Sequence, residues 1–560
     1  MKVPLAGAAA AAPTIAARVQ DEADHGGPDE TVGEAKPPGR RIALNTAIFS
    51  IATGLSRVAG LIREVVASSY FGTSGAFSAF TIAFQVPNLI RALVADSALS
   101  AAFVPVFTEL LEQRRRQEAF RLAGALFGLI LVALGVVTVL FIAIAPLAMP
   151  LLTAGDKFTP ELDALTAGLS QVLFPIVVLL GLNGLVVGVL NAYDHFTVPA
   201  IAPVVWNLVI IACLVGLKPL FDGDEQLYAY AIGVLAGTVV QFAMALPVLR
   251  RVGFELKISF RFRDPRIRQV LLLMLPVTIG LGLINFNLMI NSLVGVLVDE
   301  GTPAAIDRAF RLYMLPQGMF SVAVATVLFP ALSRLAARRD FDGLRRASGN
   351  GVRQIALLLI PAAVGTAVLA EPLTRLVYER GEFGPGSTEA VSEALFWFSF
   401  SLPFAGANLL LTRTFFSLRR PWVPTSLAGL TLVVNAGVSY ALYKPLGIGG
   451  VVLGTAVASA VMTVAQAYWL RRELHGFEIG RTLRAVAAIL AASALLGVIA
   501  YGLWYVLDDA LGRSLLAQFV SVTAALGIAS AVYGVAVLAL RIPEAQQIAG
   551  LVRRRFGRAS

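Results

Sequence analysis

Charged residues are scarce in this sequence. Only 14% of its 560 residues are Asp, Glu, Lys or Arg, whereas 57% are hydrophobic and the mean hydropathy is +0.77. Soluble domains carry roughly 25% charged residues, so a fold surrounded by water is excluded. Most of the chain must be solvated by lipid, where glycine and proline within apolar helices are tolerated.

Cysteine and histidine are nearly absent. Cys213 is the single cysteine, which excludes an internal disulfide, and we interpret it as a small buried hydrophobe. His25, His195 and His475 are far apart and form no ligand-spaced cluster, so no metal centre or other cofactor is expected. The net charge of +10 comes from short basic runs between apolar segments, a pattern that argues against nucleic-acid binding.

The first segment, residues 1–39, is rich in Ala and Pro and then acidic, with too little hydrophobicity to fold. Its beginning resembles a weak signal sequence, but Pro4 and Pro13 interrupt the apolar run. We predict a disordered cytoplasmic tail.

Apolar runs of about 20 residues, the length needed to cross roughly 30 Å of hydrocarbon, recur from residue 45 to the end of the chain. They predict an all-α polytopic membrane protein with about 14 transmembrane helices. The runs lie near 45–68, 77–107, 122–150, 163–190, 200–217, 228–249, 270–298, 309–333, 352–370, 390–412, 423–443, 449–470, 483–507 and 516–540.

Basic residues are distributed unequally between alternate loops. With the helices placed as above, the loops on one side carry 24 Lys or Arg residues, and the opposite loops carry seven, Arg308 among them. Because cytoplasmic loops hold the excess of positive charge, both termini are predicted to be cytoplasmic.

The chain also contains a weak internal repeat. An Ala-Phe pair precedes Pro87 and another precedes Pro316, about 230 residues later. Repeated halves are a common transporter plan, and they predict two pseudo-symmetric six-helix lobes. We expect lobes at 40–249 and 250–475, a C-terminal helix pair at 476–545 and a basic cytoplasmic tail at 546–560.

Four arginines, Arg57, Arg63, Arg91 and Arg311, interrupt apolar helices. Each costs roughly 2.5 to 3.5 kcal/mol at a helix centre on insertion scales, so we predict a water-filled cavity. Arg57 and Glu64 are seven residues apart on one helix face and can pair. Asn88 precedes Arg91 by three residues, beside a predicted kink at Pro87, and joins the candidate substrate-binding residues.

The alternative interpretation is that these arginines extend to the interface or pair with Glu64 and Asp96. Two acids do not neutralise four cations, however, and the surplus positive charge favours an anionic ligand. Guanidinium groups bind phosphate through paired charge-assisted hydrogen bonds. We therefore predict a substrate with a phosphate or diphosphate head group.

Longer stretches closely resemble the MurJ (MviN) lipid II flippases of the multidrug/oligosaccharidyl-lipid/polysaccharide exporter superfamily. The similarity begins at Leu55–Phe107, which reads LSRVAGLIREVVASSYFGTSGAFSAFTIAFQVPNLIRALVADSALSAAFVPVF. It continues through LPQGMFSVAVATVLFPALSR at Leu315–Arg334 and YERGEFG at Tyr378–Gly384, and it covers about residues 42–545.

The resemblance implies a V-shaped pair of lobes working by alternating access, with an additional helix pair that forms a groove for a polyprenyl tail. It places the family's cavity arginines on the four residues singled out above, where they hold the diphosphate and sugar of lipid II. Glu64 matches a family acid, and Asp96 stands where many members have Glu. Ser78 and Phe310 stand where members carry Asp. We expect gating or ion-pair contacts at Glu64, Asp96 and Ser78.

Some members of this family bind sodium in the second lobe, and the corresponding candidate cation site here is Asn435, Ser439 and Thr455. Without a carboxylate such a site lacks the negative charge that offsets dehydration of the ion. The membrane potential is the predicted energy source, because the cavity itself is cationic.

The resemblance thus implies a lipid II flippase, and no enzyme, in the bacterial cytoplasmic membrane. It would move the undecaprenyl-diphosphate-linked peptidoglycan precursor from the inner to the outer leaflet. Its expected partners are lipid II and the phospholipid bilayer, with cell-wall synthesis proteins as candidates. The alternative is an exporter of another polyprenyl-linked glycan or amphiphile from the same superfamily. A membrane enzyme would need acidic metal-binding pairs or a nucleophile and base, and the sequence offers no such constellation.

Overall fold

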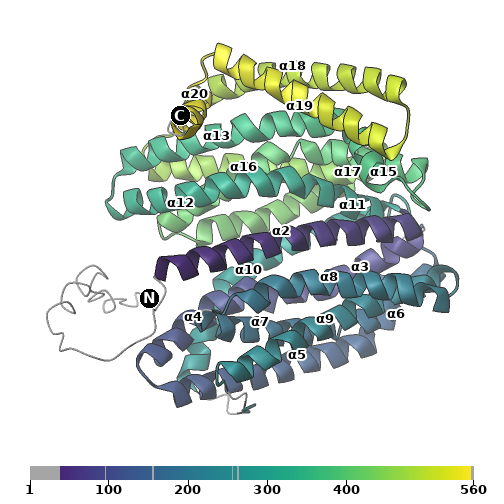
Figure 1. The fold of residues 1–560 in the computed structure, drawn as a ribbon, viewed down its shortest axis with the longest axis vertical. Helices are drawn as coiled ribbons and strands as arrows, with labels where there is room; N and C mark the ends of the chain where they lie inside the picture. The colour runs from purple at the N-terminus through teal and green to yellow at the C-terminus, as the bar shows by residue number, and fades with distance from the viewer. Residues whose placement is uncertain are drawn as a thin grey trace.

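The computed structural model is a bundle of helices that run nearly side by side (Figure 1). It describes the backbone of residues 38–556 except 95, 154–156, 194, 255–256 and 261–263. Side chains are described between residues 51 and 550, except at these gaps, in 92–101, at scattered positions in 273–284 and at 548. The predicted tail lies outside the described residues up to position 37.

One half of the bundle is formed by the first eight described α-helices, and the other by those that follow. The first eight are α2 Pro38–Phe71, α3 Gly75–Val94, α4 Asp96–Glu112, α5 Arg116–Leu152, α6 Pro160–Leu173, α7 Ile176–Ala192, α8 Thr197–Leu217 and α9 Leu227–Arg251. The others are α10 Pro265–Gly295, α11 Thr302–Pro316, α12 Val322–Ala337, α13 Phe341–Val368, α14 Ala370–Tyr378, α15 Pro385–Ser399, α16 Leu402–Ser417, α17 Trp422–Glu473, α18 Ile479–Leu511, α19 Leu515–Ala539 and α20 Pro543–Phe556.

Helical backbone covers each apolar run identified in the sequence, with interruptions that prolines and glycine explain. A π-helical turn, Gln317–Ser321, follows Pro316, where the ring removes a helical hydrogen bond. The helix α17 covers two predicted runs and kinks at Gly447, whose φ of 54° suits glycine. Within the described residues, nine helical segments are long and apolar enough to cross a membrane, or ten if the pair α15 and α16, bent by 47°, forms one span.

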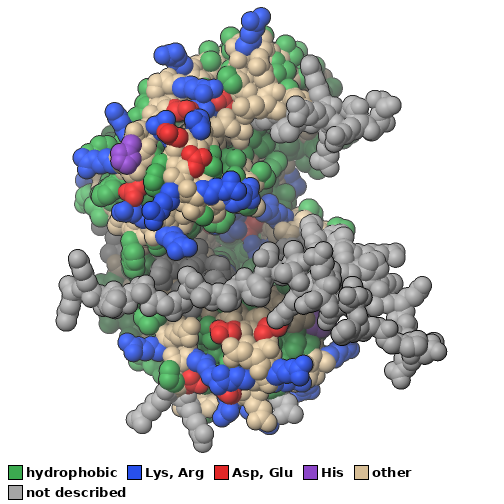
Figure 2. All heavy atoms as spheres, turned by 90° about the vertical axis from the view of Figure 1, so that its left-hand side faces the viewer, with side chains coloured by type: hydrophobic (Ala, Val, Ile, Leu, Met, Phe, Trp, Pro, Cys, Tyr) green, Lys and Arg blue, Asp and Glu red, His purple; other side chains and the backbone are tan. Residues whose placement is uncertain are grey.

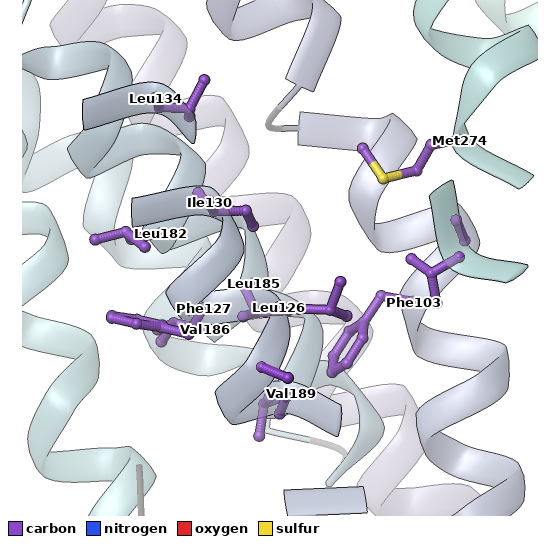
Figure 3. Packing of buried hydrophobic residues seen from close by; sticks show 14 of the residues in the cluster. Phe103, Leu126, Phe127, Ile130, Leu134, Leu182, Leu185, Val186, Val189 and Met274 are labelled. Atoms are coloured by element: carbon purple, nitrogen blue, oxygen red, sulfur yellow. The ribbon is translucent and has the colours of Figure 1, made fainter. Parts of the chain in front are cut away.

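The core of the first half lies between α4, α5 and α7 (Figure 3). Phe103 and Leu126 are fully or almost fully buried there, with Val189 beside them. The start of α10 joins this core through Met274, while Asn291 near its end contacts α17. The helix α10 is therefore shared by both halves of the molecule.

The helix pair α18 and α19 lies along the outer edge of the second half, and buried ion pairs attach it near both ends (Figure 1). Near one end, Arg353 of α13 donates to Glu478, just before α18, at 2.9 Å, and to Glu544 of α20. Near the other end, Arg375 of α14 donates to Asp508 of α18. The helix α20 crosses the direction of the bundle (Figure 1). It contains most of the predicted basic tail at 546–560, which is therefore helical as far as residue 556.

The start of α2 and the whole of α20 lie at the same end of the bundle, hereafter the terminal end. The opposite end, where α2 finishes at Phe71, is the far end. Figure 2 looks onto the terminal end and shows Lys and Arg side chains spread over both halves of the molecule.

Candidate substrate-binding site

A buried cluster of charged side chains joins the two halves of the bundle between α2 and α11. Glu64 of α2 accepts hydrogen bonds from its neighbour Arg63 and from Arg308 of α11. Arg311, one turn further along α11, lies 3.0 Å from Glu64 through Nη1. Its Nε donates to Asp307 at 2.8 Å, in the i, i+4 spacing that places two side chains on one helix face.

The cluster carries more positive than negative charge. Three guanidinium groups face two carboxylates, Glu64 and Asp307. The side chain of Arg308 is 0% exposed and that of Glu64 is 5% exposed, whereas Arg311 is 35% exposed. Burial of a charge is costly unless it is paired, so the partly accessible, incompletely neutralised Arg311 is the group best placed to bind an anion.

The cluster also shows how two expectations from the sequence were wrong. Arg57 does not pair with Glu64, because Arg308 and Arg311 of α11 reach that carboxylate instead. The side chain of Arg57 is exposed and makes no ion pair with any described residue. Arg308 is not in a loop, because α11 begins at Thr302 and not near 309. Asp307 and Arg308 are thus members of the candidate site that were not predicted from the sequence. Their position four and three residues before Arg311, in one helical register, is the signal that could have identified them.

Arg91 lies on α3, apart from the cluster as far as the described contacts go. Its Nε donates to Oδ1 of Asn88 at 2.9 Å, so Asn88 orients the guanidinium from the preceding turn. Pro87 lies inside the continuous helix α3, and Arg91 is half-buried. The side chain of Asp96 lies outside the described residues.

Exposure along α2 changes at Arg63. Between Ile51 and Ile62 most side chains are exposed, including Leu55 at 55% and Val58 at 56%. From Arg63 to Gly72 the residues are buried or half-buried. The described part of α2 is therefore exposed on the terminal-end side of Arg63 and packed on its far-end side, and the charged cluster lies where the packing begins.

Backbone contacts between the two halves close the far end. The amide of Glu382 donates to the carbonyl of Ser69 at 2.9 Å, and Thr73 Oγ1 donates to Ser387 Oγ at 2.9 Å. A Cβ atom on Gly301 would lie 2.4 Å from the carbonyl oxygen of Thr73, so only glycine permits this approach. We call this set of contacts the far-end closure.

Ser78 takes part in the same closure. It is fully buried, and its Oγ accepts a hydrogen bond from the amide of Ala304, in the first turn of α11, at 3.2 Å. This amide belongs to the first helical turn, which has no intrahelical partner for its N–H groups, so a neutral hydroxyl satisfies it. The contact crosses from α3 to α11.

The candidate cation residues form a neutral hydrogen-bonded ring between α10 and α17. Asn291 donates to Thr455 Oγ1 at 2.8 Å, and Asn435 donates to Oδ1 of Asn291 at 2.8 Å. Ser439 donates to Oδ1 of Asn435 at 3.2 Å and to the carbonyl of Val451 at 2.8 Å. All four side chains are buried, and they satisfy one another without a carboxylate.

Among the residues that the structure describes, no group of three or more His, Cys, Asp or Glu side chains could hold a metal ion. The fold and the cluster together define a helical membrane protein whose two halves meet at a buried charged site.

The chain belongs to the family described as "Lipid II flippase MurJ", whose model matches residues 67–542. A "Probable lipid II flippase MurJ" from Rhizobium tropici is 31% identical over 454 residues, 80% of this chain and 84% of the relative. A "Lipid II flippase MurJ" from Burkholderia cenocepacia is 30% identical, over 77% of this chain and 84% of the relative. The family consists of transporters, so the chain is not an enzyme.

Solved structures show the same fold. "Lipid II flippase MurJ, inward closed conformation" superposes with a TM-score of 0.71 at 23% identity and covers 87% of this chain and 98% of that chain. An inward-facing multidrug transporter of the MATE family gives a TM-score of 0.62 at 18% identity, over 76% of this chain and 94% of that chain. The all-helical membrane fold predicted from the sequence is thereby confirmed.

Proposed function

We propose that this protein translocates lipid II across the bacterial cytoplasmic membrane by alternating access. The observation that carries the proposal is the buried cluster with surplus positive charge, placed between an open terminal end and a closed far end. Its guanidinium groups suit a diphosphate, because their planar forks give paired charge-assisted hydrogen bonds and do not deprotonate.

The geometry suggests an order of events. The head group enters from the terminal end and meets Arg57, and Arg91 with its partner Asn88. Its diphosphate then competes with Glu64 for Arg311, whose bond to Glu64 crosses between the two halves. Loss of that bond weakens the attachment of α2 to α11, and the far-end closure can separate. The polyprenyl tail meanwhile stays in lipid, along the pair α18 and α19.

We further propose that the terminal end is cytoplasmic and that the chain crosses the membrane fourteen times, as two six-helix lobes at 40–249 and 250–475 and the pair within 476–545. The charge bias between loops and the basic side chains on the terminal end support this orientation (Figure 2). Cell-wall synthesis proteins are the partners this function would require on the other side of the membrane.

The test is rescue of a bacterium depleted of its own lipid II flippase. The unaltered gene should restore growth. Arg91→Ala and Arg311→Ala should each abolish rescue while the protein still reaches the membrane. The reason is that each lost charge-assisted hydrogen bond is worth about 1.5 to 3 kcal/mol. Arg311→Lys should also impair rescue, because the bidentate fork is lost. The matched control is Arg420→Ala, which removes an exposed arginine paired with Glu473 at 3.0 Å.

Full rescue by both Arg91→Ala and Arg311→Ala at normal expression would contradict the anion site. Failure of the unaltered protein to rescue, with diphosphate still bound, would instead favour another polyprenyl-linked glycan as the substrate.

A further inference from the structure

Arg308 is fully buried among side chains from both halves of the molecule. Its side chain is 0% exposed and lies one turn nearer the start of α11 than Arg311. Its Nη1 donates to Glu64, and its guanidinium carbon lies 4.1 Å from the centroid of the Phe77 ring and 6.0 Å from that of Tyr378. Glu64 and Phe77 belong to one half of the molecule, whereas Arg308 and Tyr378 belong to the other.

Two of the three guanidinium nitrogens of Arg308 have no hydrogen-bond partner in the part of the chain that the structure describes. Neither Nε nor Nη2 has a hydrogen-bond partner among the described residues, and the same holds for the buried hydroxyls of Tyr378 and of Ser68, one turn beyond Glu64. Buried donors are nearly always paired, because leaving one without an acceptor costs free energy. The faces of Phe77 and Tyr378 attract the positive charge but supply no hydrogen-bond acceptor of ordinary strength.

Besides Glu64, the carboxylate of Asp307 lies 3.8 Å from Nη1 of Arg308, but neither acid accepts from Nε or Nη2. The unused donors of Arg308 point in addition to a ligand with several acceptor oxygens, and a phosphate group offers these in the geometry of a guanidinium fork. In the closed form the ligand has no route to Arg308. When the halves separate at the far end, Glu64 and Phe77 move away with α2 and α3, and Arg308 becomes accessible beside Tyr378.

We propose that Arg308 is a further phosphate-binding residue, which holds the diphosphate of the substrate when the far end is open. The inference rests on the proposed function and extends it, because it assigns the head group a second position on the exit side. Arg311 binds from the terminal end, and Arg308 receives the same group after the closure has opened.

The experiment compares two forms of the full-length protein. The closed form carries Thr73→Cys and Ser387→Cys in a Cys213→Ser background, where the hydroxyls to be replaced lie 2.9 Å apart and a disulfide can hold the closure. The open form carries Gly301→Val, whose side chain would collide with the carbonyl of Thr73. Gly386→Val is the matched control, because a Cβ atom there meets nothing within 4 Å.

Arginines are modified with phenylglyoxal, and the modified positions are located by peptide mass spectrometry. We expect Arg308 to remain unmodified in the closed form and in Gly386→Val, to be modified in Gly301→Val, and to be protected there by inorganic diphosphate but not by chloride at equal ionic strength. Adding Arg308→Gln to Gly301→Val should weaken diphosphate binding roughly tenfold.

The inference is overturned if Arg308 is never modified, if it reacts equally in the closed form, or if diphosphate leaves it unprotected in Gly301→Val while Arg311 is protected. The last outcome leaves the proposed function standing. If diphosphate protects neither arginine, the anion site itself is wrong. Because the modification is measured on unaltered Arg308, the result does not depend on the folding of Arg308→Gln.

Discussion

At the scale of residues, the balance of charge around Glu64 decides both stability and binding. The carboxylate of Glu64 accepts hydrogen bonds from Arg63 and Arg308 and forms an ion pair with Arg311, and its side chain is 5% exposed. Glu118 provides a comparison on the surface: it also accepts from two arginines, Arg115 at 2.8 Å and Arg266 at 2.7 Å, but its side chain is 29% exposed. Solvent screens the ion pairs of Glu118 but not those of the buried Glu64.

We therefore predict that Glu64→Gln destabilises the protein far more than Glu118→Gln. The buried guanidinium groups would lose their shared counter-charge, at a cost of about 3 to 5 kcal/mol for a broken buried pair. Thermal unfolding in detergent, followed by intrinsic fluorescence, measures the difference. Equal shifts in the midpoint temperature for the two variants would show that the cluster is solvated in the folded protein.

At the scale of elements, the neutral ring between α10 and α17 replaces charge with hydrogen bonds. A hard cation is held by oxygen ligands, and carboxylates supply the charge that offsets its dehydration. Here Asn291, Asn435, Ser439 and Thr455 use their polar atoms on one another. The helices α10 and α17 are thus joined by neutral hydrogen bonds.

Lipid flipping should accordingly be independent of sodium. In proteoliposomes at a fixed membrane potential, replacement of sodium by potassium or choline is expected to leave the flipping rate unchanged. Collapse of the potential should slow flipping, because each charge moved across 100 mV is worth about 2.3 kcal/mol. Ser439→Asp is the matched variant, because it adds a carboxylate to the ring and should give a sodium-dependent rise in the unfolding temperature. Loss of transport without sodium in the unaltered protein would refute the prediction.

At the scale of the whole molecule, the asymmetry between the two ends defines the conformation. The side chains of α2 are exposed toward the terminal end and packed beyond Arg63, and the far-end closure joins the halves through Ser69, Thr73 and Gly301. If the terminal end is cytoplasmic, as we propose, this is an inward-facing form.

The orientation makes a direct prediction. In a Cys213→Ser background, cysteines replacing Asp224 or Asp509 should react with an impermeant thiol reagent added to intact cells. One replacing Asp342, whose side chain is 69% exposed at the terminal end, should react only after the membrane is permeabilised. The reverse pattern would contradict the orientation, and labelling of the cysteines replacing Asp224 and Asp509 from opposite sides would contradict the count of fourteen crossings.

How much of this could be read from the sequence differs between the helices and the site. The apolar runs located the helices because a span of hydrocarbon imposes length and hydropathy locally. Burial cost likewise singled out Arg63 and Arg311 one at a time. The ion-pair partners could not be predicted in this way. A spacing of seven residues placed Arg57 and Glu64 on one helix face, but in the structure Glu64 pairs with arginines of α11. No local rule states which helix lies opposite.

The sequence by itself determined that the chain is a helical membrane transporter, which family it belongs to, and that the arginines within its apolar helices outnumber the acids near them. These properties follow from composition and from motifs within single segments. Only the tertiary structure decided that Arg308 is buried in the cluster, that Asn291 completes the ring with Asn435, and that the halves meet at one end. Each of these depends on contacts between segments tens to hundreds of residues apart, which packing selects and local periodicity does not specify.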